Sequence, residues 1–92
     1  MDVKQAVSKA KTYVLDLFAE ETPANVALEE VEFNNNTSEW LITVGFNRPW
    51  DNPNSFLDED SVLYEPRRSY KVVRISDTTG SVLSVKNHET AH

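Results

Sequence analysis

The sequence predicts an α+β fold, with one N-terminal amphipathic helix packed on a four-stranded antiparallel sheet in the order helix, strand, strand, strand, strand. Three patterns predict it. Apolar residues recur at three- and four-residue steps near the N-terminus, residues 39–47 alternate with the period of a strand, and residues 69–86 form two strand-like runs around a turn. A chain of 92 residues with 39% hydrophobic content supplies one core, so we expect a single domain over residues 1–87 and a tail at 88–92.

The acidic composition limits the classes of partner. Asp and Glu number 15 against 9 Lys and Arg, a formal charge of -6, whereas nucleic acids and anionic membranes are bound by clustered basic surfaces. The chain has no cysteine, no apolar run long enough to span a membrane and no secretion signal at its N-terminus. We therefore expect a cytoplasmic protein, a monomer or weak homodimer, with an unidentified protein partner, no nucleic acid, no membrane association and no cofactor.

The helix is expected over residues 3–20, with an apolar stripe on one side and polar residues on the other. Asp2 is placed to cap its start, and Thr22-Pro23 ends it because the residue before proline is pushed out of helical geometry. A helix of this length is marginal in water by itself, so the stripe must dock on the sheet. The stripe consists of Val3, Ala6, Val7, Ala10, Val14, Leu17 and Phe18.

Four strands are expected at about 27–33, 39–47, 69–76 and 81–86. The first alternates weakly and is placed at an edge of the sheet. The last two are joined by a turn that ends in Gly80, which fixes their register as a hairpin. The second has the clearest pattern, and its predicted core face carries Trp40, Ile42, Val44 and Phe46.

One helix covers one face of a sheet, so the opposite face is expected to be solvated. Its apolar content is high for a bare surface, which reflects either ordinary β-propensity or a face that binds a partner or a second copy of the chain. The residues placed on this face are Leu41, Thr43, Tyr70, Val72 and Arg74, with Val82 as a further candidate.

The connection over residues 48–68 holds three of the four prolines and shows no sustained alternation. A connection this long inside a compact domain is usually functional or disordered. Its large apolar residues favour either folding back on the end of the sheet or a recognition loop, since Trp, Tyr and Arg are enriched at interface hot spots. The candidate partner-binding residues are Arg48, Trp50, Phe56, Tyr64, Arg67 and Arg68.

Two short patterns resemble catalytic motifs. His88-Glu89-Thr90-Ala91-His92 matches H-E-x-x-H, in which a helix presents two histidines to zinc. No third ligand follows it, so we expect no metal site, and a disordered tail or adventitious metal binding are the other interpretations. The adjacent Glu29 and Glu30 are expected on opposite faces of a strand, where they could not act as a pair. We therefore predict no catalytic residues.

The C-terminal hairpin, YKVVRISDTTGSVLSVK, resembles the closing hairpin of PepSY-type domains, most sharply at Thr79-Gly80-Ser81-Val82-Leu83. The helix-then-sheet plan is also broadly cystatin-like. The resemblance implies a regulator or inhibitor of peptidases, as in propeptides of thermolysin-type enzymes, without catalytic residues. The chain departs from that pattern in the long 48–68 connection, in the missing secretion signal, and at Lys71, where an inward apolar residue is expected.

The sequence thus favours a non-enzymatic protein-interaction or regulatory domain, with peptidase inhibition among the possible roles. Two other classes stay open. One is a zinc-dependent hydrolase that uses His88 and His92, and the other is a structural module that forms a homodimer through the solvated sheet face.

Overall fold

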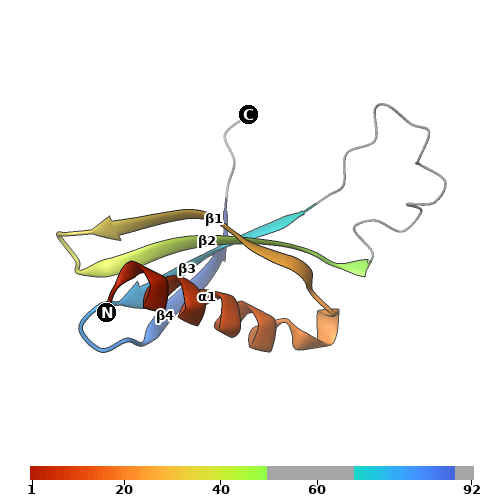
Figure 1. Cartoon of the computed structure of the whole chain (residues 1–92), viewed down its shortest axis with the longest axis horizontal. Coiled ribbons are helices and arrows are strands. Elements are labelled where there is room, and N and C mark those ends of the chain that lie inside the picture. Colours follow the sequence, from red (N-terminus) through yellow and green to blue (C-terminus); the bar gives the residue numbers. More distant parts are fainter. Residues whose placement is uncertain (50–67, 89–92) are drawn as a thin grey trace, which may run out of the picture.

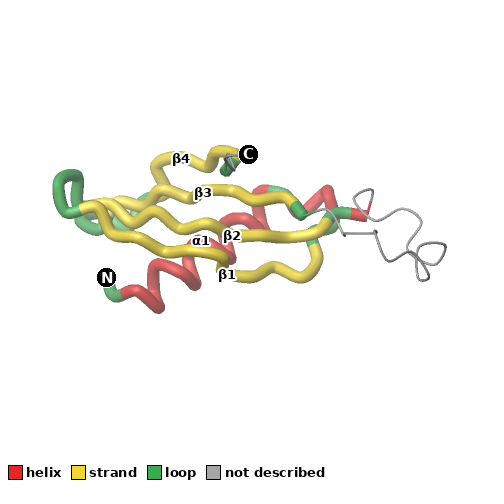
Figure 2. Tube along the Cα trace, turned by 90° about the horizontal axis from the view of Figure 1, so that it is seen from above, coloured by secondary structure: helices red, strands yellow, loops and turns green. Residues whose placement is uncertain are grey.

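The chain folds as one helix laid across one face of a four-stranded antiparallel sheet (Figures 1 and 2). A computed structural model describes residues 1–49 and 68–88. The strands neighbour one another in chain order, β1-β2-β3-β4, which confirms the predicted fold class. The elements are α1 (Val3–Leu17), the 3-10 turn η1 (Ala19–Glu21), β1 (Ala24–Asn34), β2 (Glu39–Asn47), β3 (Ser69–Ser76) and β4 (Val82–Asn87).

Helix α1 begins with a capping box, as Asp2 predicted. The Gln5 backbone N–H donates to Asp2 Oδ1 at 2.8 Å, and the Asp2 N–H donates to Gln5 Oε1 at 2.9 Å. These contacts satisfy two N–H groups that the first turn leaves free. The α-helix ends at Leu17, three residues before the expected end, because the chain tightens into η1. Thr22 then adopts a left-handed φ of 51°, which turns the chain into β1 before Pro23.

The core lies between α1 and the sheet. On the helix, the fully buried residues are Ala6, Ala10 and Val14, which are small enough to let α1 approach β1, β2 and β3 closely. Two members of the predicted stripe do not join them, since Val3 is 43% and Leu17 53% exposed, whereas Val7 and Phe18 pack against the core while partly buried. The sheet contributes Ile42, Val44, Phe46, Val73 and Ile75, all fully buried.

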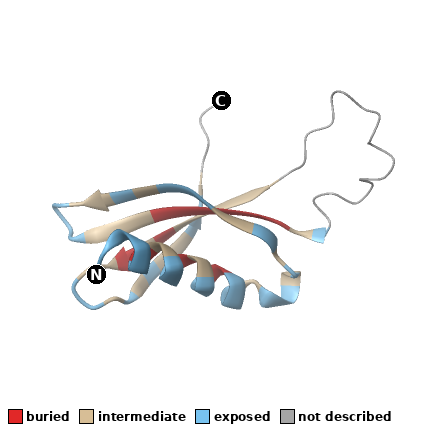
Figure 3. Ribbon diagram, viewed as in Figure 1, coloured by how far each residue is buried: buried red, intermediate tan, exposed pale blue. Residues whose placement is uncertain are grey.

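Strand β2 confirms its predicted core face and occupies the centre of the helix contact. Figure 3 shows buried residues concentrated along this strand. Trp40 is half-buried at the start of the strand, with its ring centroid 4.8 Å from that of Phe33 on the neighbouring edge strand β1. At the other end, Phe46 lies 5.4 Å from Phe18. Aromatic pairs therefore close both ends of the apolar layer.

Val82, in the β3–β4 hairpin, lies on the opposite face of the sheet from the one predicted. A register irregularity between Arg74 and Ile75 sets Val82 opposite Ile75, on the helix side, where it packs against the core. The expected position on the helix-free face is wrong, because the irregularity shifts the inside–outside alternation by one residue. Leu83, next to it, is 44% exposed.

Lys71 faces the helix side, opposite Val44, where the PepSY pattern predicts an apolar residue. Its ammonium Nζ lies 5.3 Å from the centroid of the Phe18 ring and donates to Asn87 Oδ1. The aliphatic stem can cover apolar surface while the charged end reaches a ring face and a polar acceptor. Lys71 is thus accommodated at the margin of the core.

No helix in the described part of the chain is long and apolar enough to cross a membrane.

Candidate functional site

The helix-free face of the sheet brings the predicted face residues together. In the β2–β3 register Leu41 lies opposite Arg74, Thr43 opposite Val72, and Gly45 opposite Tyr70. The face is less solvated than expected, since Leu41, Tyr70, Val72 and Arg74 are all half-buried. Thr43, in the middle, is only 4% exposed, although no helix among residues 1–49 and 68–88 covers this face.

A bulge in β1 places two carboxylates on this face. The β1–β2 register shifts between Leu28 and Glu30, which leaves Glu29 as an extra residue. Glu30 lies opposite Thr43, and the Glu29 side chain lies over Gly45. The expectation that Glu29 and Glu30 point to opposite faces is therefore wrong. It assumed an unbroken two-residue period, which the bulge interrupts.

Gly45 permits the close approach of Glu29 to the sheet. A Cβ atom at Gly45 would lie 2.8 Å from Glu29 Oε2 and 3.1 Å from Arg68 Nη2. Both distances are shorter than ordinary van der Waals contact. Glycine in a strand interior often marks a site where another group approaches the backbone, and here that group is a carboxylate with its guanidinium partner.

Arg68, a predicted partner contact, is engaged within the domain. Its Nη1 donates to Asn47 Oδ1 at 2.7 Å and its Nη2 to the Asn25 carbonyl at 2.9 Å. Nη2 also lies 3.6 Å from Glu29 Oε2. One side chain thereby ties the start of β3 to both β1 and β2.

Of the other predicted partner contacts, only Arg48 lies within the described part of the chain. Arg48 Nη1 donates to Glu21 Oε1 at 3.0 Å, and the Arg48 guanidinium carbon lies 6.0 Å from the centroid of the Phe46 ring. Arg48 thus connects the end of β2 to η1. The residues outside the described part are Trp50, Phe56, Tyr64 and Arg67.

A hollow of about 300 Å³ opens on the helix-free face, beside the bulge. Strands β1, β2 and β3 and the residue that follows β4 supply its lining. The His88 N–H donates to the Tyr70 carbonyl at 3.0 Å, which extends the pairing of that strand. The lining residues are Glu29, Glu30, Thr43, Tyr70 and His88.

The lining is rich in hydrogen-bond acceptors. Two carboxylates are acceptors only when ionised, and the Thr43 and Tyr70 hydroxyls can both accept and donate. Within residues 1–49 and 68–88 the Thr43 hydroxyl makes no side-chain hydrogen bond, although the residue is 4% exposed. Such a site suits a donor-rich, positively charged group. No group of three metal-ligating side chains occurs among the described residues.

His88 is the only position of the H-E-x-x-H pattern that lies within the described residues. Its backbone pairs with β3 as a continuation of a strand. The zinc motif needs a helix that carries both histidines on one side. Zinc binding by this motif stays a prediction. His88, the first residue of the motif, pairs with β3 as an extended strand does.

A second hollow, of about 450 Å³, lies between α1 and β1 and differs in chemistry. Its apolar members include Val3 and Leu28, which are 43% and 39% exposed where the helix overhangs the edge of the sheet. Lys4 and Lys11 stand at its rim, and no carboxylate lines it. The full lining is Val3, Lys4, Val7, Ser8, Lys11 and Leu28.

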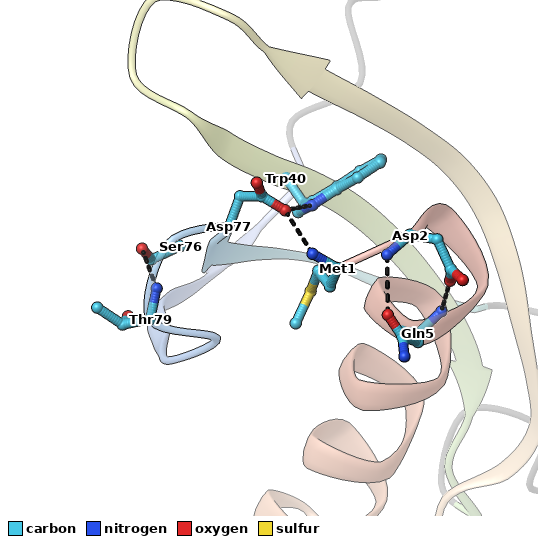
Figure 4. A network of polar contacts seen from close by, with 7 residues as sticks. All are labelled: Met1, Asp2, Gln5, Trp40, Ser76, Asp77 and Thr79. Atoms are coloured by element: carbon cyan, nitrogen blue, oxygen red, sulfur yellow. Dashed lines mark hydrogen bonds and ion pairs between the residues drawn. The ribbon is translucent and has the colours of Figure 1, made fainter.

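The β3–β4 turn has a structural role that the sequence pattern predicted only in part (Figure 4). Trp40 Nε1 donates to Asp77 Oδ1 at 3.0 Å, and the Met1 ammonium lies 3.2 Å from the same oxygen. The Trp40 hydrogen bond, followed by the contact with the ammonium group, lowers the pKa of Asp77. Gly80 closes the turn with a φ of 74°. Asp77 thus holds the hairpin against the start of β2.

No protein-family model matches the chain, and neither a curated protein nor a solved structure matches it. The PepSY-like resemblance of the hairpin therefore stays a prediction.

Proposed function

We propose that the protein is a non-enzymatic interaction or regulatory domain that binds a positively charged segment of a partner protein on the helix-free face of its sheet. The observation that carries the proposal is the hollow at the β1 bulge, where four strands converge on acceptor groups. Hydrogen-bond acceptors on a half-buried, partly apolar floor are typical of a recognition surface, which combines an apolar centre with a charged rim.

The charges of the helix-free face support a basic partner. Glu30 and Glu32 are exposed on the helix-free side of β1, and within residues 1–49 and 68–88 neither makes an ion pair or a hydrogen bond. Glu29 is paired only at 3.6 Å with Arg68. A formal charge of -6 for the whole chain adds a long-range attraction for a basic segment.

The connection over residues 48–68 is part of the same proposal, because it joins the strand ends that border the hollow. Tyr70 lies at the start of β3, and Gly45 lies near the end of β2. The predicted partner contacts Trp50, Phe56, Tyr64 and Arg67 belong to this connection and lie outside the described residues. A peptidase-regulating role, which the PepSY-like resemblance implies, is compatible with a binding surface of this kind.

A photo-crosslinking amino acid at Val72, on the helix-free face, tests the proposal in cells. Tyr13 is the matched control position, since it is 40% exposed on α1. We expect an adduct with another protein from position 72, weakened by Glu30→Lys, and none of equal yield from position 13. Equal adducts from both positions, or a yield that Glu30→Lys does not change, would contradict the proposal.

The crosslinking experiment also tests the homodimer alternative, and a metal analysis tests the zinc-hydrolase alternative. An adduct with twice the mass of the chain would identify the homodimerisation module instead. The zinc-hydrolase alternative predicts stoichiometric zinc in the purified protein, lost with hydrolytic activity when residues 88–92 are deleted.

A further inference from the structure

We infer that the hollow at the β1 bulge binds the guanidinium group of an arginine side chain in the partner. The inference rests on the proposed function and names the group that the helix-free face recognises. The hollow lies beside Gly45 and is bordered by Glu29 and Glu30 on one side and by His88 on the other.

The arrangement of acceptors matches the donors of a guanidinium group. A guanidinium carries five N–H donors in a planar fork, and carboxylates accept two of them side by side. Glu30, without an ion pair in the described part of the chain, is the free carboxylate next to the hollow. The second oxygen of Glu29, beyond the one that faces Arg68, is an additional acceptor.

Thr43 adds a neutral polar group to the lining beside the carboxylates. The residue is 4% exposed and lines the hollow, and its hydroxyl makes no side-chain hydrogen bond within the described residues. The hydroxyl is not one of the buried side-chain atoms without a partner, so its remaining exposed surface faces the hollow. A donor placed in the hollow would pair with this hydroxyl, and the β-bulge that opens the hollow is the type of irregularity that redirects side chains at functional sites.

The protein already places one guanidinium group, that of Arg68, on the same face of the sheet. Arg68 Nη2 lies 3.1 Å from the Cβ position that Gly45 leaves empty, beside Glu29. A guanidinium group therefore already lies close to the strand at Gly45, where it is paired with Glu29. The ligand arginine would occupy the neighbouring space between Glu30, Thr43 and Tyr70.

Arginine fits this hollow better than lysine does. The guanidinium can hydrogen-bond a carboxylate in two places and lie against an aromatic ring, and it is less strongly hydrated than an ammonium group. Tyr70 supplies the ring, and Glu30 supplies the carboxylate. An ammonium group would neutralise the carboxylate charge, but it would leave more of the acceptors in the hollow without a hydrogen-bond donor.

Titration of the ¹⁵N-labelled protein with Nα-acetyl-arginine methylamide tests the inference. The citrulline analogue has the same shape without the charge and is the ligand control. We expect saturable amide shifts at the five residues that line the hollow, with affinity about tenfold higher than for citrulline and higher than for the lysine analogue. Equal shifts with citrulline, tighter binding of lysine, or no saturable shifts up to about 50 mM arginine analogue would overturn it.

Glu30→Gln is the matching variant, with Glu32→Gln as its control on the same face of β1. Both side chains are exposed, so neither change threatens folding. We expect Glu30→Gln to weaken arginine binding about fivefold or more and Glu32→Gln to change it less than about twofold. Equal effects of the two variants would reduce the inference to general charge attraction and overturn the site.

The two proposals fail separately. Crosslinking from position 72 together with no arginine binding would retain the interaction face and remove the arginine site. Saturable arginine binding together with no adduct from position 72 would retain the site and remove the protein partner.

Discussion

The two faces of the sheet are built from the same strands, but their residues are buried in different chemical surroundings. On the helix side every large residue of β2 after Trp40 is fully buried in apolar surroundings. On the other side Thr43 is almost as inaccessible, but its neighbours include Glu30 and Tyr70. Burial on the first face comes from α1, whereas on the second face the Glu29 side chain lies over Gly45. The first face therefore determines stability, and the second is the face on which we propose that a partner binds.

Replacement of Phe46 by alanine should give the largest effect. Phe46 is fully buried against Phe18, so the change leaves a cavity, and we expect a loss of about 3–5 kcal/mol in the free energy of unfolding. Leu41→Ala, on the same strand but on the half-buried face, should cost less than half as much. Urea unfolding followed by circular dichroism measures both. Equal losses would show that the two faces do not differ in this way.

Arg68→Ala tests whether the polar contacts of the helix-free face also stabilise the fold. The variant removes the hydrogen bonds to Asn47 and to the Asn25 carbonyl, and we expect a loss of about 1–3 kcal/mol. Arg68→Lys should recover less than half of it, because an ammonium group cannot reproduce the fork. Full recovery by lysine would show that charge, and not geometry, matters at this position.

Thr43→Val should separate stability from binding. Valine has the shape of threonine without the hydroxyl, which makes no side-chain hydrogen bond in the described part of the chain. We expect unfolding free energy to stay equal or to rise by up to about 1 kcal/mol, while affinity for the arginine analogue falls. Thermal unfolding and the amide titration give the two values. A clear loss of stability would mean that the hydroxyl has a structural partner.

Asp77→Asn should give the smallest effect, and one that depends on pH. The pKa of Asp77 is lowered below its usual 3.8, so its charge stabilises the folded state above that value and the contribution is lost as the pH falls through the folded-state pKa. The wild-type protein should therefore exceed the variant in stability at neutral pH and approach it in acid. Unfolding curves between pH 7 and about pH 2 measure the difference. A constant difference across that interval would exclude the charge as its cause.

The sequence predicted the helix-covered face well because this face follows simple periods. Trp40 to Phe46 alternate without interruption, and Ala6, Ala10 and Val14 follow the helical repeat. The same rule failed at Val82 and at Glu29, where irregular pairing adds a residue to one strand. Periodicity cannot locate a bulge, because the extra residue changes the face of every residue beyond it.

Two signals in the sequence pointed to the bulge in β1. Leu28 and Val31 are both apolar, and both face the helix side. In an unbroken strand, residues three positions apart point to opposite faces. Gly45 interrupts the strand opposite and marks a close approach. Together they would have placed Glu29 and Glu30 on one face. Nothing in the sequence indicated that His88 would join them, because that contact depends on how far β4 continues its pairing.

The irregularity in β1 has a consequence for the behaviour of the protein in concentrated solution. β1 is an outer strand, and outer strands can recruit a strand from another molecule and begin a fibril. The bulge at Glu29 interrupts the regular pairing of β1, and bulges and charged residues on an outer strand disfavour such recruitment. We therefore expect β1 to resist edge-to-edge pairing with a second molecule.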